Sequence, residues 1–459
     1  MTALAPPAPA ALRPAEPSPP PASGRRRRAW AGALLVLLGV DVGAVFAVAL
    51  ARLPVDAAAP GGLALWGGRA AGLLAQVLVL ALVLLAARVP VLERAVGQDR
   101  LLRWHRWLAP SALVALVAHP LLLAAGYGGS WWTSLVSLGS TTADALVGTG
   151  LFLLAAALSV RALRRRLPYE GWHLLHLTTY AAVVLVFLHQ LTAGTAVLSN
   201  AVLRGWWLAQ LVAVLAAALV FRVVLPLWRS ARHDVRVSSV RRESPDVVTV
   251  TFSGRDLDRL GPTGGQFLSW RFLDRAHWWR AHPFSLSVAP TADTLRLTAR
   301  QVGDGTRLLD GLRPGTRVLV EGPYGVLTAQ SRSTDRLLLI GAGLGIAPLR
   351  ALLEELPPHV DVVVLHRAST SADAVLHDEL QLLARRRPHT RVELVAGPRG
   401  AAGDPDRPLS GRSLQLLCPD AADREVFLCG PPGLTDDLLS TLRQLGIPRA
   451  RLHSESFEL

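Results

Sequence analysis

Long apolar stretches dominate the first half of the chain, and short alternating segments dominate the second half. Six stretches each supply about 20 residues, the length that crosses a hydrocarbon layer of ~30 Å at about 1.5 Å per residue. They occupy residues 30–51, 67–87, 107–126, 143–160, 172–192 and 206–226. A signal peptide is the alternative for the first stretch, but its apolar run exceeds the usual roughly 7–15 residues. The pattern therefore predicts six membrane helices, with the first one retained.

From His233 onward, alternating apolar and polar positions are interrupted by Gly, Pro and Asp turns, which predicts an antiparallel β-barrel. Its strands are expected at residues 247–252, 267–272, 284–288, 295–299 and 317–320. From Asp335 onward, apolar strands alternate with glycine loops and helical stretches, the pattern of an α/β domain with a parallel sheet. Those strands are expected at residues 337–340, 361–366, 392–395 and 425–429.

These patterns divide the chain into four parts. Residues 1–28 begin with Ala, Pro and Ser and carry almost no large apolar side chain, so we expect a disordered tail there. Residues 29–230 form an all-α six-helix transmembrane bundle. Residues 231–330 form the antiparallel β-barrel, and residues 331–459 form the α/β domain.

The basic residues mark the topology of the bundle. The formal charge of +14 over 459 residues includes no lysine, so every Lys/Arg position is an arginine. If the N-terminus is cytoplasmic, thirteen arginines fall in inner segments and three in outer ones. The inner ones are Arg25–Arg28, Arg88, Arg94, Arg100, Arg103, Arg106, Arg161 and Arg164–Arg166, and the outer ones are Arg52, Arg69 and Arg204. This asymmetry predicts a multi-pass cell-membrane protein with both ends cytoplasmic, and we expect no nucleic-acid partner.

The outer loop at residues 127–143 has no basic residue, and its Trp131 and Trp132 suit an aromatic belt at the membrane surface. The chain has only two cysteines, Cys418 and Cys429. A four-cysteine iron–sulfur cluster or a cysteine-rich zinc site is therefore excluded within one chain, and a disulfide framework is not expected. Any redox chemistry must use an organic cofactor or a histidine-bound metal.

Five histidines fall in or at the edge of the third and fifth predicted membrane helices: His105, His119, His173, His176 and His189. A lone membrane histidine is usually a packing residue, but this concentration favours a metal or haem, because polar groups in hydrocarbon are costly. The 14-residue spacing from His105 to His119 gives about 21 Å of rise on nearly one helix face.

The fifth helix fits less well. His176 and His189 lie roughly 140° apart on an ideal helix, and replacing His176 by His173 gives no better phase. Thr178 and Thr179 could help the helix bend by bonding back to its backbone. Two stacked haems between these helices would each take one histidine from either side. An iron with two histidine ligands has no open position, which favours electron transfer over binding of oxygen at the metal.

Other polar groups in the bundle keep two interpretations. Arg103 and Arg106 could pair with propionates of an inner haem or could simply be interfacial charges. Arg69 or Arg204 could pair with propionates on the outer side. Asp41 falls in the middle of the first membrane helix, where it is either a functional acid or a neutral hydrogen-bonded carboxyl group, and we assign it no role.

Three short motifs fall in the predicted barrel. His282-Pro283-Phe284-Ser285 begins a strand, and Ser285 could hydrogen-bond the redox-active edge of a flavin. Arg300 and Gly303-Asp304-Gly305-Thr306 precede a helical turn whose N–H groups could hold a pyrophosphate. Glu321-Gly322-Pro323-Tyr324-Gly325 closes the barrel. Each motif alone is weak, since Gly-Asp-Gly is ordinary turn chemistry.

The α/β domain carries a glycine loop between a strand and a helix, Gly341-Ala342-Gly343-Leu344-Gly345-Ile346-Ala347-Pro348. Its small residues let a phosphate approach the backbone amides, although it differs from the G-x-G-x-x-G fingerprint. Arg367 and Ser369 come at the end of the next strand and suit a 2′-phosphate, which favours NADPH over NADH, although Arg367 could simply be a surface arginine in a chain so rich in arginine.

Two further features complete the expected nucleotide site. Cys429-Gly430-Pro431 ends the last long strand, where the nicotinamide should lie, although Cys429 could simply be a small buried residue. Phe457 in the terminal Glu-Ser-Phe could cover the flavin ring until nicotinamide displaces it. We expect Ser285, Cys429 and Phe457 at the reacting centre.

In this order, the motifs resemble the ferredoxin–NADP reductase-type flavoprotein module. Joined behind six helices with paired histidines, they resemble the ferric reductase and NADPH oxidase superfamily over nearly everything after residue 29. The resemblance implies FAD, because family members with His-Pro-Phe-Thr bind it, and this chain has Ser at the last position. It also implies His105 with His176 as ligands of an inner b-type haem and His119 with His189 as ligands of an outer one. No plant-type ferredoxin domain is expected.

The implied activity is transmembrane oxidoreduction, from cytoplasmic NADPH or NADH through FAD and two b-type haems to ferric iron or dioxygen at the outer face. In such a chain the protein mainly positions the cofactors and tunes their potentials. An alternative is an electron-donor subunit that reduces a quinone or a membrane partner protein. A third hypothesis is a six-helix transporter gated by a nucleotide-binding domain, which would bind no haem.

Overall fold

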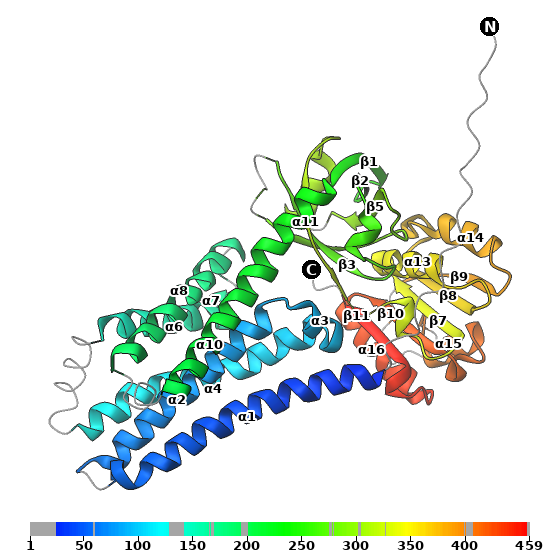
Figure 1. The fold of residues 1–459 in the computed structure, drawn as a ribbon. Helices are drawn as coiled ribbons and strands as arrows, with labels where there is room; N and C mark the ends of the chain where they lie inside the picture. The colour runs from blue at the N-terminus through cyan, green and yellow to red at the C-terminus, as the bar shows by residue number, and fades with distance from the viewer. Residues whose placement is uncertain are drawn as a thin grey trace.

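A computed structural model describes residues 24–57, 60–127, 142–164, 166, 169–193, 201–274, 278, 280–301, 304–325, 327–398, 400 and 407–456. A group of long helices lies on one side of the molecule, and the β-rich half lies on the other (Figure 1). The predicted tail lies almost entirely outside the described residues, as do Trp131 and Trp132.

Helices coincide with all six predicted apolar stretches. They are α1 (Gly24–Ala57), α2 (Gly62–Ala86), α4 (Gln98–Gly126), α6 (Ala143–Ser159), α8 (Tyr169–Ala193) and α10 (Ala201–Leu219). Among the described residues, four helical segments are long and apolar enough to cross a membrane: Gly62–Ala86, Arg100–Gly126, Gly171–Leu191 and Ala201–His233. Val36–Val48 and Ala143–Ser159 are apolar but shorter. A count of six spans therefore stays a prediction.

Small residues let the helices of the bundle approach closely. A Cβ added to Gly68 of α2 would lie 2.9 Å from the Leu123 side chain of α4. A Cβ added to Gly148 of α6 would lie 2.7 Å from Val186 of α8. Such contacts between backbones are typical of membrane helices, where packing replaces the hydrophobic effect as the force between helices. The bundle thus contains two tight pairs, α2 with α4 and α6 with α8.

The last membrane helix continues without a break into the β-rich half. After α10 comes a π-helical turn, Val220–Val224, and then α11 (Leu225–His233). The wide turn directly precedes Pro226, whose ring would otherwise clash with a carbonyl of the preceding turn. The 33 residues of this helix span about 50 Å, compared with ~30 Å of hydrocarbon. The helix therefore extends beyond the membrane and delivers the chain to the first strand (Figure 1).

Two three-stranded antiparallel sheets follow, with strand orders β1-β2-β5 and β4-β3-β6. Their strands are β1 (Arg236–Ser244), β2 (Val247–Ser253), β3 (Phe267–Phe272), β4 (His282–Ser285), β5 (Thr294–Arg300) and β6 (Val318–Tyr324). Isolated bridges at Arg236–Arg317 and Leu286–Leu297 connect the sheets. Trp270 and Phe252 stack at 4.4 Å in the apolar core between them. The antiparallel arrangement is confirmed, while closure into a barrel stays a prediction.

The remainder is a five-stranded parallel sheet with the order β11-β10-β7-β8-β9. Its strands are β7 (Arg336–Ala342), β8 (Asp361–Ala368), β9 (Thr390–Ala396), β10 (Glu425–Gly430) and β11 (Leu452–Ser456). Its helices are α13 (Ile346–Glu355), α14 (His377–Arg385), α15 (Gly411–Leu417) and α16 (Pro432–Gln444). The strand order reverses between β7 and β10, which makes this point the expected ligand crevice of a doubly wound fold.

The antiparallel sheets and the parallel-sheet domain pack against each other at α13. The loop before β3 lies so close to α13 that a Cβ on Gly264 would collide with the Ala351 carbonyl. Arg350 of α13 pairs with Glu379 of α14 at 2.8 Å, and Arg296 of β5 pairs with the same carboxylate at 2.7 Å. Arg296 thus ties the antiparallel sheets to the parallel sheet through a shared acidic side chain.

Candidate functional site

The histidines of α4 and α8 face each other in two pairs. The ring centroids of His105 and His176 are 6.3 Å apart, and those of His119 and His189 are 6.1 Å apart. His105 contacts the Leu82 carbonyl near the end of α2, whereas His119 contacts the Gly68 carbonyl near its start. The pairs therefore lie at two levels of the bundle.

Backbone contacts fix the orientation of three of these rings. The Nδ1 atoms of His105 and His119 lie 3.0 Å and 2.7 Å from their carbonyl partners, and His189 Nδ1 contacts the Val186 carbonyl. A carbonyl can only accept, so each Nδ1 carries the proton and each Nε2 is the unprotonated nitrogen of its ring. Metal-binding histidines are usually held in this way by a second group on the other nitrogen. Nδ1 of His176 is buried without a partner among the described residues.

The spacing of the pairs fits an iron atom between two imidazoles. Imidazole nitrogens bind first-row metals at roughly 2.0–2.1 Å and lie about 1.1 Å from the ring centre, so two rings flanking one metal have centroids about 6 Å apart. The measured 6.3 Å and 6.1 Å agree with this value. Gly72 of α2 provides room beside the second pair, because a Cβ there would lie 2.7 Å from His119 Nδ1.

On an ideal helix, His176 and His189 of α8 would point in different directions, and two side-chain hydrogen bonds within α8 give a local explanation for how both can face α4. The hydroxyl of Thr179 donates to the His176 carbonyl and that of Thr178 donates to the Leu175 carbonyl, both at 2.7 Å. Such bonds bend helices, and both had been expected. His176, and not His173, has the ring contact with His105.

The other polar groups of the bundle are also placed. Arg103 and Arg106 are exposed, so both interpretations of these residues stay open. Asp41 accepts a hydrogen bond from Gln210 Nε2 at 2.9 Å.

Two of the flavin motifs meet across one strand. Phe267 of β3 pairs with Ser285 of β4 on one side and with Tyr324 of β6 on the other. The Ser285 hydroxyl is buried and lacks a partner among the described residues. Burial raises the pKa of the Tyr324 phenol. The register thus brings His-Pro-Phe-Ser and Glu-Gly-Pro-Tyr-Gly to the same end of one sheet.

The remaining flavin-motif residues surround this position. In β4, His282 and Phe284 are half-buried and Pro283 is exposed. Gly322 and Gly325 have φ values of +130° and +94°, which favour glycine, and Pro323 lies between Gly322 and Tyr324.

The predicted pyrophosphate loop is only partly described. Asp304, Gly305 and Thr306 lie in the short helix α12 (Asp304–Arg307). Arg300 pairs with Asp246 at 3.2 Å. Gly303 lies outside the described residues.

The glycine loop and the end of β10 touch at the point where the strand order reverses. Gly341 ends its strand pairing opposite Cys429, and a Cβ on Gly345 would collide with the Cys429 carbonyl. A Cβ on Gly430 would lie 2.9 Å from the Ala342 side chain. Gly343 has a φ of +56° and open space around it, and Pro348 lies buried in the first turn of α13. Pro431 is exposed at the N-cap of α16.

One residue of the expected nucleotide site, Arg367, differs from what the sequence suggested. The buried Arg367 guanidinium donates to the carbonyls of Gly397 and Pro398 at 2.7 Å and 2.9 Å, and also contacts the Val395 and Ala368 carbonyls. It is turned into the domain and holds the end of β9, so it does not present a free cation to a 2′-phosphate. Ser369 is exposed.

Cys429 is fully buried, and burial raises the pKa of its thiol well above the usual value. It therefore stays a neutral thiol, as in its packing interpretation. Phe457 lies outside the described residues. His366 of β8 matched no sequence motif, yet it is fully buried level with Gly341, and burial lowers the pKa of its imidazole to about 4.

Sequence reasoning also missed how the bundle holds the flavin motif. Arg88, just after α2, donates to the Tyr324 hydroxyl at 2.6 Å and pairs with the Glu321 carboxylate. Its guanidinium lies 4.9 Å from the centre of the Tyr324 ring. Arg229 of α11 donates to the Gly322 carbonyl at 2.7 Å. Arg88 had been counted only as a marker of topology, because its partners lie more than 200 residues further along the chain.

Comparison with known proteins gives matches in both halves of the chain. Residues 71–187 match the family "Ferric reductase like transmembrane component", and residues 339–439 match the "Oxidoreductase NAD-binding domain". The glycine betaine monooxygenase reductase subunit of Chromohalobacter salexigens is 27% identical over 247 residues, which cover 51% of this chain and 67% of the relative. The ferredoxin reductase component of a 3-ketosteroid-9-alpha-monooxygenase from Rhodococcus rhodochrous is 32% identical over 48% of this chain and 64% of its own length. A ferredoxin NADP+ reductase structure from Neisseria gonorrhoeae, with FAD and NADP bound, has a TM-score of 0.39 and 21% identity, and covers 49% of this chain and 97% of its own.

The fold, the site and these matches define a membrane-associated oxidoreductase with an FAD- and NAD(P)H-binding reductase module. The two family matches stand in the order of the fused architecture of the ferric reductase and NADPH oxidase superfamily, with the transmembrane component first and the NAD-binding domain second.

Proposed function

We propose that this chain carries electrons from cytoplasmic NADPH or NADH through FAD and two bis-histidine b-type haems to an acceptor at the outer face of the cell membrane. The observation that carries the proposal is the pair of facing histidine couples at two levels of the bundle. The arginine count supports the orientation, with both chain ends in the cytoplasm. Ferric iron or dioxygen is the proposed acceptor.

Four histidines would hold the haems, which supply one-electron chemistry. His105 and His176 form the inner couple, because His105 contacts α2 at Leu82, six residues before Arg88 and its flavin-motif partners. His119 and His189 form the outer couple. Because carbonyls engage Nδ1, the Nε2 atoms of His105, His119 and His189 would be the ones to bind the haem irons. Two imidazoles per iron leave no open position, which suits outer-sphere transfer.

The reductase module would consist of an FAD-binding domain at residues 231–330 and an NAD(P)H-binding domain at residues 331–459. Ser285 would donate to the flavin from its buried, unpartnered hydroxyl. The glycine loop and Gly430 would bind NAD(P)H at the point where the strand order reverses. Cys429 would provide an uncharged wall beside the nicotinamide. Because Arg367 is engaged by backbone carbonyls, Ser369 is the better candidate for a contact with a 2′-phosphate.

A second candidate function is that of an electron-donor subunit for a quinone or a partner protein. It is favoured by the names of both relatives described above, which are a reductase subunit and a ferredoxin reductase component. The two functions differ in one measurement. The first predicts that purified protein reduces a membrane-impermeant ferric chelate or dioxygen without any partner, and the second predicts that it does not.

The test of the haem assignment uses purified membranes and an absorption spectrum. The wild type should contain two bis-histidine haems per chain that NADPH reduces without oxygen. His119→Ala or His189→Ala should each lower the ratio from two haems to one. His173→Ala is the matched control on the same helix and should retain both. Retention of both haems in the His119 and His189 variants would contradict the assignment, and readmission of oxygen or ferric chelate to the reduced protein identifies the acceptor.

A further inference from the structure

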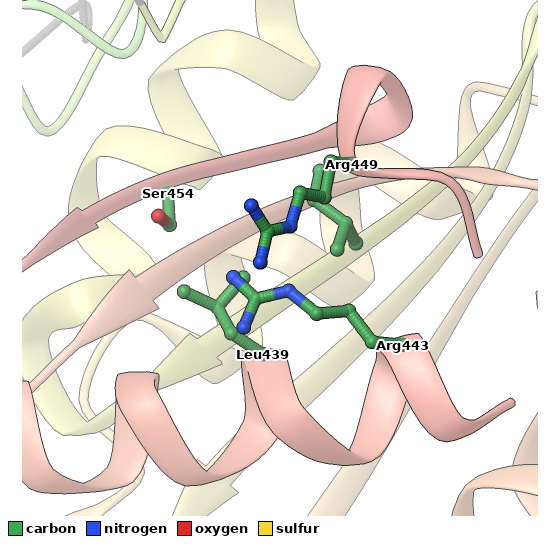
Figure 2. A pocket seen from close by; sticks show the side chains of 5 residues that line it. Leu439, Arg443, Arg449 and Ser454 are labelled. Atoms are coloured by element: carbon green, nitrogen blue, oxygen red, sulfur yellow. The ribbon is translucent and has the colours of Figure 1, made fainter. Parts of the chain in front are cut away.

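A cavity unrelated to the redox site opens between α16 and β11. It has a volume of about 290 Å³ and is lined by Leu439, Arg443, Arg449, Leu452 and Ser454. The guanidinium groups of Arg443 and Arg449 turn toward each other above Leu439, and Ser454 stands beside the same hollow (Figure 2). Since side chains two positions apart share one face of a strand, Leu452 and Ser454 both line it.

The cavity lies away from the expected nucleotide crevice. In a parallel sheet, the crevice opens at the carboxyl ends of the strands, where Gly341 and Gly430 stand. Arg449 precedes the amino end of β11, and Arg443 is in the last turn of α16, whose first turn follows the crevice. The two arginines therefore sit toward the opposite edge of the sheet and cannot share a ligand with the glycine loop.

The charges of this cavity are not balanced by the protein. Within the described ranges, neither the Arg443 nor the Arg449 side chain has a hydrogen-bond or ion-pair partner, whereas many other arginines of this domain are paired with carboxylates or carbonyls. Two cations held face to face repel each other, and an anion between them removes that repulsion. Each guanidinium offers several donors in a fixed plane, which suits bidentate contact with an oxyanion.

We infer that this cavity is a binding site for a phosphate group. A phosphate monoester carries a charge of about −1.5 to −2 near pH 7, which matches two guanidinium groups. Its oxygens can also accept from the Ser454 hydroxyl, while Leu439 and Leu452 provide an apolar floor. The volume lies just below the roughly 300–1,000 Å³ that is typical of small-molecule sites. It fits a small phosphorylated compound or the headgroup of an anionic phospholipid.

The experiment measures the reaction of individual arginines with phenylglyoxal by mass spectrometry, on the full chain in phospholipid nanodiscs. In the first arm, the discs contain only phosphatidylcholine and inorganic phosphate is titrated. In the second arm, phosphate is absent and the discs contain phosphatidylglycerol. Protection of Arg443 and Arg449 in the first arm identifies a soluble phosphate ligand, and protection in the second arm alone identifies a lipid headgroup.

Variants give the matched controls. Arg443→Gln or Arg449→Gln should weaken the protection of the other arginine about 10-fold or more, because each removes a charged contact to the anion. Arg386→Gln, at an exposed arginine that follows α14, should leave it unchanged. The inference is overturned if the wild type shows no protection in either arm, or if Arg386 is protected to the same degree. Neither readout requires electron transfer, so the result does not depend on the proposed function.

Discussion

Glu93 places a carboxyl group beside the contact between the helical bundle and the flavin motif. It lies in the short helix α3 (Pro90–Val96), and one of its oxygens is buried without a hydrogen-bond partner among the described residues. The pKa of Glu93 is raised to about 7, mainly by burial and also by the Glu321 carboxylate, while Arg88 and Arg222 oppose the shift. The protonated form is therefore favoured in the folded protein.

A pH dependence follows from this shift. Between pH of about 4.5 and 7, the folded chain holds a proton that the unfolded chain has lost, so stability falls as the pH rises through this window. Glu93→Gln cannot lose this proton, so it should remove the part of the fall in unfolding free energy that Glu93 causes. That part is at most about 3 kcal/mol, at roughly 1.4 kcal/mol per pKa unit. The measurement is the midpoint of flavin release on heating, between pH 5 and 8.

Part of the slope should persist in the Gln variant, because burial also raises the pKa of Glu355 in α13 to about 7. Glu355→Gln is therefore the comparison variant. In the double variant the slope should reverse sign below a pH of about 6.5, because burial lowers the pKa of His366 to about 4 and only the unfolded chain takes up that proton. An unchanged pH profile in Glu93→Gln would be inconsistent with a buried, titrating carboxyl group at this position.

At the scale of single elements, the glycine loop packs closely against β10. A Cβ on Gly345 would overlap the Cys429 carbonyl oxygen, so the loop and the strand must separate in Gly345→Ala. Overpacking of this kind costs about 1–3 kcal/mol, and here it also displaces the backbone amides proposed to hold a phosphate. We expect affinity for NADPH to fall about 10-fold or more, measured by the NADPH dependence of flavin reduction.

Gly311→Ala is the matched control for this variant. Gly311 lies in a 3₁₀ turn of the flavin-binding part, and its added Cβ would meet no atom within 4 Å. It should leave both stability and NADPH affinity close to those of the wild type. Equal affinity in Gly345→Ala and Gly311→Ala would show that the close packing of the loop does not matter for the nucleotide.

The elements differ in how well the sequence predicted them. Residues 267–272 were expected as a strand and form β3 with the same bounds, because apolar side chains alternate there above a buried core. β1 was missed, since an edge strand with the sequence Arg-Val-Ser-Ser-Val-Arg-Arg-Glu-Ser buries little and has no clear period. The edge strand β11 was also missed, whereas the edge strand β5, whose Leu295, Leu297 and Ala299 are buried, was expected. Pattern reasoning detects regular burial and not the place of a strand in its sheet.

The residues of the candidate site also differ in how well the sequence predicted them. Histidine spacing on α4 was readable from helix geometry, but the choice between His173 and His176 depended on the bend of α8 and on the family resemblance. Arg367 looked like a free cation in the sequence, because its partners are backbone carbonyls, which every residue carries. Arg88 could not be linked to Glu321 from sequence, since no periodicity connects residues in separate domains.

At the scale of the whole molecule, two arginines bind the bundle to the reductase module. Arg88 contacts Glu321 and Tyr324, and Arg229 contacts the Gly322 carbonyl. Arg88→Gln removes the nearer of the two arginines that pair with the half-buried Glu321 and leaves only Arg271 at 3.9 Å, so the module should sit less firmly on the bundle. We expect electron flow from NADPH to the outer acceptor to slow about 10-fold, as positioning errors of about 1 Å can cost more than this.

The measurement for this prediction separates two steps. Flavin reduction by NADPH, followed with ferricyanide as a soluble acceptor, should keep its wild-type rate in Arg88→Gln, and only transfer into the membrane domain should slow. Arg88→Lys should recover part of the loss. The control is Arg100→Gln, an exposed arginine near the start of α4. If both steps slow together, Arg88 supports the module's fold and not its placement.

The continuous helix from Ala201 to His233 connects the membrane bundle directly to the reductase half. About 30 Å of its length is held by lipid and roughly 20 Å projects beyond it, so a tilt of the membrane arm swings the projecting arm by a comparable angle. Helix tilt responds to bilayer thickness. A thicker or thinner membrane is therefore expected to shift the reductase half through this continuous helix, whose π-helical turn at Val220–Val224 is the point where it can bend. The rate of electron transfer is therefore expected to depend on the thickness of the bilayer, and hence on its lipid composition.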